Sequence, residues 1–201
     1  MDLTARATLL VLAAACASSA PAASSAPSAP AAPVVTTPVA ATVPVAPVPS
    51  SELGAALTGA WTGQLEYRDF QSNERVFLPT WLTVTQAGGP LQFDYVYDDG
   101  PAKTVRERMR LTLDAAAAQI RFISDRDHHD ETYAVAGLAD FAKRRTLVLT
   151  GPGTENDHAV EVRITLTVRR NLYTLVKETR AAGGDFQFRD GYTFTRAAPR
   201  S

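Results

Sequence analysis

The sequence has very little cysteine and almost no excess of charge. Cys16 is the one cysteine among 201 residues, so no disulfide can form within the chain. Lysine and arginine total 20 and aspartate and glutamate total 21, which gives a formal net charge of -1. Proteins that bind nucleic acid usually carry a strong basic excess, and polybasic membrane-binding patches need one as well. The composition therefore argues against a nucleic-acid partner and against electrostatic attachment to a membrane.

The sequence also lacks long apolar runs. The apolar run near the amino terminus is short. It spans residues 7–15 and follows Arg6. A helix needs about 20 consecutive apolar residues to span a bilayer, so this run is too short. A weakly basic start, a short apolar stretch and then small residues are typical of a secretory signal peptide. We therefore expect residues 1–15 to be a signal peptide.

The stretch Leu12-Ala-Ala-Ala-Cys16 resembles the lipobox of bacterial lipoprotein precursors, in which small residues precede an invariant cysteine. In that family, cleavage falls just before the cysteine, whose thiol carries a diacylglycerol. The resemblance implies lipidation of Cys16, although Ala13 stands where the family usually has leucine. Ala17, in place of aspartate, would then imply a lipid-anchored cell-envelope protein in the outer membrane, facing the periplasm. The alternative is cleavage after a later small residue such as Ala20, which would leave a secreted or soluble periplasmic protein.

Residues 16–50 differ sharply from the rest of the chain. After Cys16, nearly every residue is alanine, proline, serine, valine or threonine. Such a segment buries too little apolar surface to offset the entropy of ordering it, and its prolines favour extended conformations. We expect a disordered, lipid-anchored linker over residues 16–50 and a single folded domain over residues 51–201.

The folded part shows the period-two alternation of β-strands. In the stretch from Leu57 to Tyr67, one face carries Trp61 and Leu65 and the other carries mostly polar residues. Similar short runs follow, separated by turn signals such as Asp98-Asp-Gly-Pro101, and this spacing is typical of a sandwich or a barrel. Successive hairpins favour a single antiparallel up-and-down β-barrel of about 8–10 strands. Residues 51–56 are expected to form a helical turn that closes one barrel end.

Two stretches resemble the calycin superfamily, which includes lipocalins and fatty-acid-binding proteins. They are Gly59-Ala-Trp61 on the first strand and Tyr192-Thr-Phe-Thr-Arg196 on the last. In that superfamily, the tryptophan packs under the barrel floor and a basic residue of the last strand lies across it. The resemblance implies that Trp61 and Arg196 form this structural pair. No second lipocalin motif of the Thr-Asp-Tyr kind is evident, so the fold is described only as lipocalin-like.

A barrel of this size either fills its interior with side chains or holds a small ligand. The alternation predicts inward rows rich in aromatic and apolar residues, which would suit an apolar or amphipathic ligand. The residues expected to bind it are Tyr67, Leu82, Phe93, Tyr95, Met109, Phe122, Ile164, Phe186 and Phe188. Glu107 and Asp190 are also expected to face inward, either as paired acids or, as is commoner in barrels, as buried ends with arginine partners.

The sequence offers little that resembles catalytic machinery. Residues 125–131 and His158 contain imidazole and carboxylate groups of the kind that bind divalent metals, but we interpret them as a charged loop without a metal. Serine and cysteine do not occur in a recognisable nucleophile motif, and no glycine-rich phosphate loop precedes a helix. We therefore expect a protein that is not an enzyme and has no cofactor.

Two functions remain open at this point. The leading hypothesis is a non-catalytic envelope lipoprotein whose barrel binds a small apolar or amphipathic ligand and which meets the membrane only through its lipid anchor. The alternative is a structural or protein-interaction lipoprotein with a packed barrel, an unspecified protein partner and no ligand. Phe77 and Trp81, which the alternation places on the outer face, would form the contact patch of the alternative.

Overall fold

A computed structural model describes residues 50–69, 72–86, 89–126 and 130–198. The predicted signal peptide, Cys16, the linker up to residue 49 and residues 127–129 of the predicted charged loop lie outside these ranges. Within them, no helix has the length and apolar character that a membrane span requires.

The described residues form two short helices and ten strands. The helices are α1 (Ser50–Leu57) and α2 (Phe141–Arg144). The strands are β1 (Gly59–Arg68), β2 (Arg75–Gln86), β3 (Leu91–Asp98), β4 (Thr104–Asp114), β5 (Gln119–Ser124), β6 (Asp130–Ala136), β7 (Thr146–Glu155), β8 (His158–Val168), β9 (Leu172–Arg180) and β10 (Gln187–Arg196).

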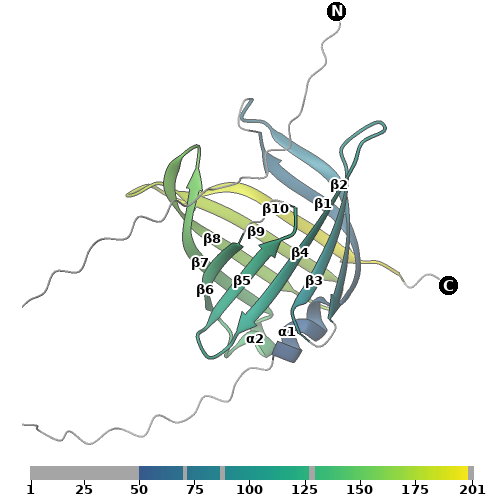
Figure 1. Ribbon diagram of the computed structural model, residues 1–201, viewed down its shortest axis with the longest axis vertical. Coiled ribbons are helices and arrows are strands. Elements are labelled where there is room, and N and C mark those ends of the chain that lie inside the picture. Colours follow the sequence, from purple (N-terminus) through teal and green to yellow (C-terminus); the bar gives the residue numbers. More distant parts are fainter. Residues whose placement is uncertain (1–49, 70–71, 87–88, 127–129, 199–201) are drawn as a thin grey trace, which may run out of the picture. The chain divides into compact units, whose positions relative to one another are not determined.

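The strands form one closed, antiparallel, up-and-down barrel (Figure 1). Each strand pairs with its neighbour in sequence, and β10 closes the ring by pairing with β1. In this last pair, Trp61 lies opposite Arg196 and Leu65 lies opposite Tyr192. Closure leaves no strand edge available for pairing with another chain. The predicted all-β, up-and-down barrel is thus confirmed, at the upper end of the expected strand number.

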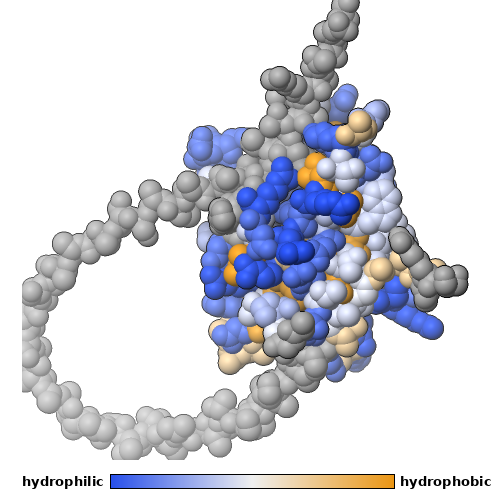
Figure 2. All heavy atoms as spheres, turned by 45° about the vertical axis from the view of Figure 1, so that its right-hand side comes forward, coloured by the Kyte–Doolittle hydropathy of each residue, from blue (hydrophilic) through white to orange (hydrophobic). Residues whose placement is uncertain are grey.

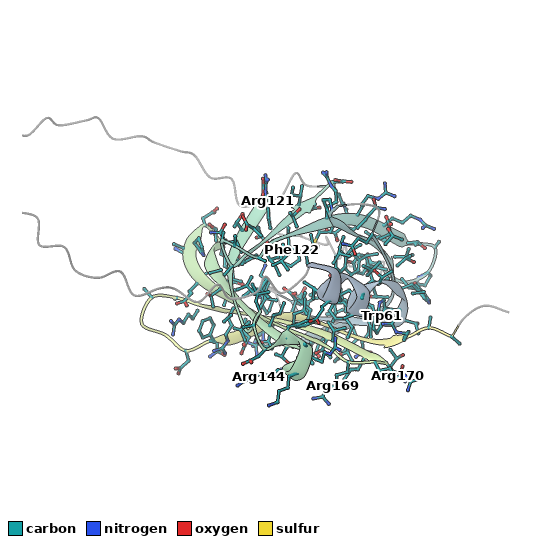
Figure 3. The ribbon with its side chains drawn as sticks, turned by 90° about the horizontal axis from the view of Figure 1, so that it is seen from below. Trp61, Arg121, Phe122, Arg144, Arg169 and Arg170 are labelled. Atoms are coloured by element: carbon teal, nitrogen blue, oxygen red, sulfur yellow. The ribbon has the colours of Figure 1, made fainter. Side chains whose placement is uncertain are left out.

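Alternation along each strand places the core inside the barrel. On β3, Leu91, Phe93, Tyr95 and Tyr97 are buried, whereas the residues between them are not. Figure 3 shows the same alternation on β5, where Arg121 points away from the barrel and Phe122 points into it. Because side chains on a strand point alternately to its two faces, the sequence pattern alone decides which row is inside.

One end of the barrel, here called the helix end, is covered by both helices (Figure 1). Viewed along the barrel, α1 lies within the ring of strands (Figure 3). Leu53 and Leu57 of α1 and Phe141 of α2 are almost fully buried and belong to the barrel core. The indole Nε1 of Trp61 donates a hydrogen bond to the Leu57 carbonyl oxygen at 2.8 Å, which fixes the end of α1 to β1. The expected closing turn is therefore an eight-residue helix.

The outer face is largely hydrophilic on the side shown in Figure 2. On β4, the outward residues Arg108 and Arg110 form ion pairs with Asp94 at 2.7 Å and Asp125 at 3.0 Å. Phe77 and Trp81 on β2 are the exposed large hydrophobic residues among the described positions, at 51% and 48% exposure. The outward orientation predicted for both is confirmed.

Candidate functional site

At the helix end, Arg196 holds the loop after α1 against the barrel. Its guanidinium lies 4.1 Å from the centre of the Trp61 ring. Its Nη1 donates to the Thr58 carbonyl oxygen and its Nη2 to the Ala56 carbonyl oxygen, each at 2.9 Å. This pair joins β1, β10 and α1, so its role in the structure is to close the barrel.

A column of aromatic rings runs from this end through the barrel. Trp61 contacts Tyr173 with ring centres 5.9 Å apart, and further contacts of 5.3–6.5 Å continue the column through Phe194, Tyr192, Tyr95 and Tyr97. Rings from β3 and β10 meet across the interior because β1 carries Gly63 between them. A Cβ at Gly63 would lie 2.8 Å from the Phe194 Cα atom, which leaves no room for a side chain. This side of the barrel is therefore filled.

At the end of the column away from Trp61, the hydroxyl of Tyr97 belongs to a group of hydrogen-bonded polar side chains. The Tyr97 hydroxyl donates to Glu107 Oε2 at 3.2 Å and lies 3.0 Å from the Tyr192 hydroxyl. Ser124 Oγ donates to Glu107 Oε1 at 3.4 Å. Burial raises the pKa of both Tyr97 and Tyr192 well above the usual tyrosine value, so both remain neutral hydrogen-bond donors.

Further ionisable side chains occupy this end, here called the polar end, which lies opposite the helix end. Glu155 forms an ion pair with Arg189 at 2.5 Å and accepts a hydrogen bond from Thr179 at 2.9 Å. Tyr133 donates to Glu131 at 2.9 Å. The cross-strand partners Lys177 and Asp190 also belong to this group. Burial lowers the pKa of Arg189 and raises that of Asp190, because each charge has been removed from water.

Several inward side chains are not sealed off from solvent. Met109, Phe122 and Leu175 pack against the core, yet they keep part of their accessible surface. Asp190 and Tyr192 lie deep enough for burial to dominate their pKa shifts, and they too keep accessible surface. The inward side chains of the polar end are thus less completely buried than those of the helix end.

Seven of the nine residues expected to bind a ligand face the interior. Leu82, Phe93, Tyr95 and Ile164 are buried in the packed core, and the partly accessible ones are Tyr67, Met109 and Phe122. Glu107 and Asp190 also face inward, as expected. Glu107 accepts hydrogen bonds from Tyr97 and Ser124.

The predicted inward orientation is wrong for Phe186 and Phe188. Phe186 lies outside the barrel, 4.0 Å from the Arg163 guanidinium and 4.4 Å from that of Arg180. Phe188 packs 4.6 Å from the Arg75 guanidinium, also on the outer face. A β-bulge between Phe188 and Asp190 inserts one extra residue, so the facing before it is reversed relative to the facing after it.

Sequence reasoning missed several residues of the polar end. Lys177 could have been found, because it shares an alternating row with the buried residues Tyr173 and Thr179. Glu155 was hidden because Gly151-Pro-Gly153 resembles a turn, whereas β7 continues through these residues and pairs with β8 up to Glu155. Arg189 occupies the bulge, for which the sequence gives no signal.

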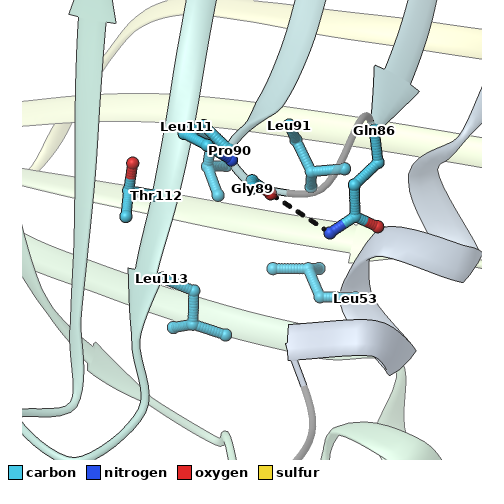
Figure 4. Close-up of a pocket in the computed structure, with 8 residues that line it drawn as sticks. All are labelled: Leu53, Gln86, Gly89, Pro90, Leu91, Leu111, Thr112 and Leu113. Atoms are coloured by element: carbon cyan, nitrogen blue, oxygen red, sulfur yellow. Dashed lines mark hydrogen bonds between the residues drawn. The ribbon is translucent and has the colours of Figure 1, made fainter.

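A separate apolar cleft of about 250 Å³ lies at the helix end, between α1 and the ends of β2, β3 and β4 (Figure 4). None of its lining residues is charged, and Gln86 uses its amide to donate to the Gly89 carbonyl oxygen at 3.3 Å. Binding sites usually combine apolar walls with convergent polar groups. The polar end meets this description better than the cleft does. Among the described residues, no three histidine, cysteine or acidic side chains are grouped so that they could hold a metal ion.

Comparisons with known proteins identify the fold. No family model matches the sequence, and no curated protein matches it. Among solved structures, the S-type phycobiliprotein lyase CPES from Guillardia theta is similar, with a TM-score of 0.51 and 10% sequence identity. The match covers 75% of this chain and 93% of the lyase chain. At this identity the likeness shows the fold alone, and that fold is a lipocalin-like barrel.

Proposed function

We propose that this chain is a non-catalytic, lipid-anchored protein of the bacterial cell envelope whose barrel binds a small amphipathic molecule. The observation that carries the proposal is the set of apolar side chains inside a closed barrel that solvent still reaches, namely Met109, Phe122 and Leu175. Burying such surface under an apolar ligand contributes about 25 cal/mol per Å². The aromatic column at the helix end cannot contribute in this way, because its side chains already bury one another.

The polar end supplies the groups that would orient the ligand. Neutral tyrosine hydroxyls, carboxylates and cations lie close to the accessible apolar side chains. They belong to the same inward-facing rows of the strands. A molecule with an apolar body and a polar head would match both environments at once. This pairing favours an amphipathic ligand over a purely apolar one.

The side chains described inside the barrel favour a binding role over a catalytic one. The structural neighbour is named a lyase of phycobiliproteins, but 10% identity does not carry its activity to this chain. Among the described inward residues, Ser124 is hydrogen-bonded to a carboxylate, and no imidazole stands beside it as a base. A binding role requires none of these groups to react.

Attachment to the envelope rests on the lipobox-like stretch that ends at Cys16. Cells grown with radiolabelled palmitate should label the wild-type chain but not a Cys16→Ser variant, and only the wild type should sediment with membranes. The matched control is Ser18→Ala, which should keep both label and sedimentation. An unlabelled wild-type chain would refute lipid anchoring and leave the binding proposal standing.

Native mass spectrometry tests binding directly. The full chain carrying Cys16→Ser, purified without detergent, should retain or take up one small amphiphile. A second substitution, Leu175→Trp, fills the accessible space and should abolish uptake. Val96→Trp adds the same ring to the outer face and serves as the matched control. A bare mass in the parent chain after exposure to fatty acids, fatty amines and phospholipids would overturn the proposal.

A second candidate function is recognition of a protein partner through the outer face of β2. It is favoured by the exposure of Phe77 and Trp81, which flank the exposed residue Pro79 on one outward row. A photo-cross-linking amino acid at Thr83 should then capture one protein of fixed mass in cells. The capture should be lost in a Phe77→Ser/Trp81→Ser double variant, and a cross-linker at Thr112, on the outer face of β4, should not reproduce it.

A further inference from the structure

Lys177 and Asp190 are opposite each other on β9 and β10, and both point into the barrel. Their inward direction follows from the register, which places Lys177 opposite the buried Ile164 and Asp190 opposite Tyr67. Directly opposed residues of an antiparallel pair have Cβ atoms about 5 Å apart. Two opposite charges therefore lie side by side on the inner wall.

These two charges do not satisfy each other. Among the described residues, neither Lys177 nor Asp190 has an ion-pair partner within 4.0 Å, and neither makes a hydrogen bond. The other charged groups around Asp190 are already engaged, since Arg189 pairs with Glu155 and Glu131 accepts from Tyr133. Lys177 and Arg189 attract the Asp190 carboxylate, but a buried charge that makes no hydrogen bond is still costly. Lys177 and Asp190 thus retain hydrogen-bonding capacity that a bound molecule would use.

The surroundings of the pair are amphipathic. Leu175 and Tyr192, which are directly opposite each other, are the next inward residues toward the helix end. Both keep accessible surface, so a ligand that reaches Lys177 and Asp190 would extend its apolar part over them.

We propose that Lys177 and Asp190 bind the polar end of the ligand, and that this ligand is a zwitterionic amphiphile. An anionic group contacts the Lys177 ammonium, and a neighbouring ammonium group contacts the Asp190 carboxylate. A ligand with one charge would satisfy one side chain and be repelled by the other. This inference rests on the proposed binding function and specifies the chemistry of its ligand.

Isothermal titration calorimetry with three matched probes tests the inference. The probes share one chain length: 2-aminodecanoic acid has both charges, decylamine has the ammonium alone, and decanoic acid has the carboxylate alone. The full chain carrying Cys16→Ser should bind 2-aminodecanoic acid about tenfold or more tightly than either single-charge probe, which corresponds to one well-formed charged contact.

Substitutions at the pair should remove this preference one charge at a time. Asp190→Asn should make 2-aminodecanoic acid bind no better than decanoic acid, and Lys177→Met should make it bind no better than decylamine. Asp190→Glu and Lys177→Arg keep the charges and should keep the preference, which separates loss of charge from loss of folding. Lys143→Met, on the exposed side of α2, is the control and should change nothing.

Each other outcome contradicts the inference in a distinguishable way. Equal affinity for the three probes would refute the role of Lys177 and Asp190 while leaving the proposed function intact. Tighter binding of decanoic acid than of 2-aminodecanoic acid would show an anion site alone and would also refute the zwitterion. No binding of any probe would refute the inference together with the proposed function.

Discussion

The two ends of the barrel use the same ten strands for different purposes. At the helix end, Trp61, Phe194 and the residues around them have almost no exposed surface, and Arg196 ties the strands to α1. At the polar end, inward rows carry carboxylates, Lys177 and tyrosine hydroxyls, and several side chains remain accessible. Close packing stabilises a fold but leaves no room for a ligand. The comparison therefore assigns stability to the helix end and leaves the polar end as the place where binding is proposed.

The largest effect should come from the packed end. Trp61→Ala removes a fully buried ring that contacts Tyr173, Arg196 and Leu57, and should lower the free energy of unfolding by about 3–5 kcal/mol. Trp81→Ala removes the same side chain from the outer face and should cost less than about 1 kcal/mol. Chemical denaturation measures both. Equal losses for the two tryptophans would contradict the asymmetry.

Arg196 should be the most important charged residue for stability. Arg196→Met keeps much of the aliphatic stem but removes donors to Thr58 and Ala56, and should cost about 2 kcal/mol. Arg108→Met removes an exposed arginine with one ion-pair partner, and no measurable change is expected. Denaturation midpoints of the two variants would compare them. A larger loss for Arg108→Met would be incompatible with the role assigned to Arg196.

Substitutions at the polar end should be milder. Tyr97→Phe removes one hydroxyl from the group around Glu107 and Tyr192, and should lower the free energy of unfolding by about 1 kcal/mol. The same variant should also change the affinity for an amphiphile, whereas Arg196→Met should not once its stability loss is taken into account. Binding and unfolding measured on both variants would show whether the two properties separate as expected.

The pH dependence of stability should have an unusual sign at Asp190. Burial raises the pKa of Asp190, although Lys177 and Arg189 oppose the shift and Glu131 and Glu155 add to it. The folded state then binds this proton more tightly than the unfolded state does. Its contribution to stability is lost as pH rises from the ordinary aspartate pKa through the raised one. Asp190→Asn should thus gain stability relative to the parent as pH rises above the ordinary aspartate pKa.

Asp130 on the outer face is the control of opposite sign. The hydrogen bond from Arg121 lowers the pKa of Asp130, so this carboxylate stabilises the fold above its unfolded pKa and loses that contribution as pH falls. Asp130→Asn should therefore lose stability relative to the parent as pH rises toward the ordinary aspartate pKa, and the difference should stay constant above it. If the stability difference from the parent changed with pH in the same direction for both variants, the assignment of Asp190 to the interior would be contradicted.

The two ends also differ in how far the sequence predicts them. Strict alternation and the Gly59-Ala-Trp61 motif were enough to predict the inward residues of the helix end and the closing segment. At the polar end, Gly151 and Gly153 suggested a turn because isolated glycines usually interrupt strands. They lie within β7 because Tyr133 and Val162 pack against them, and an added Cβ would come within 2.8 Å and 2.5 Å of those side chains. Such packing depends on residues distant in sequence.

The bulge at Arg189 limits sequence prediction in a second way. Alternation in β10 continues unbroken through Phe186, Phe188 and Asp190, so the sequence predicts one inward row. The inserted residue is specified by pairing with β9, where Phe188 lies opposite Glu178 and Asp190 lies opposite Lys177. The shift moves the two phenylalanines outside, whereas Asp190 keeps the inward direction that the alternation predicts, and pairing with β9 sets it opposite Lys177. The candidate site therefore depends on a register that only the three-dimensional structure shows.

The central claim is that the polar half of the barrel binds the ligand and the helix half stabilises the fold. Methyl NMR of the full chain with Cys16→Ser tests this claim most directly. Adding 2-aminodecanoic acid should shift the methyl signals of Met109 and Leu175 and leave those of Leu147 and Leu166 at the helix end in place. Shifts confined to Leu147 and Leu166, or no shifts at saturating probe, would contradict the division of the barrel into a packed half and a binding half.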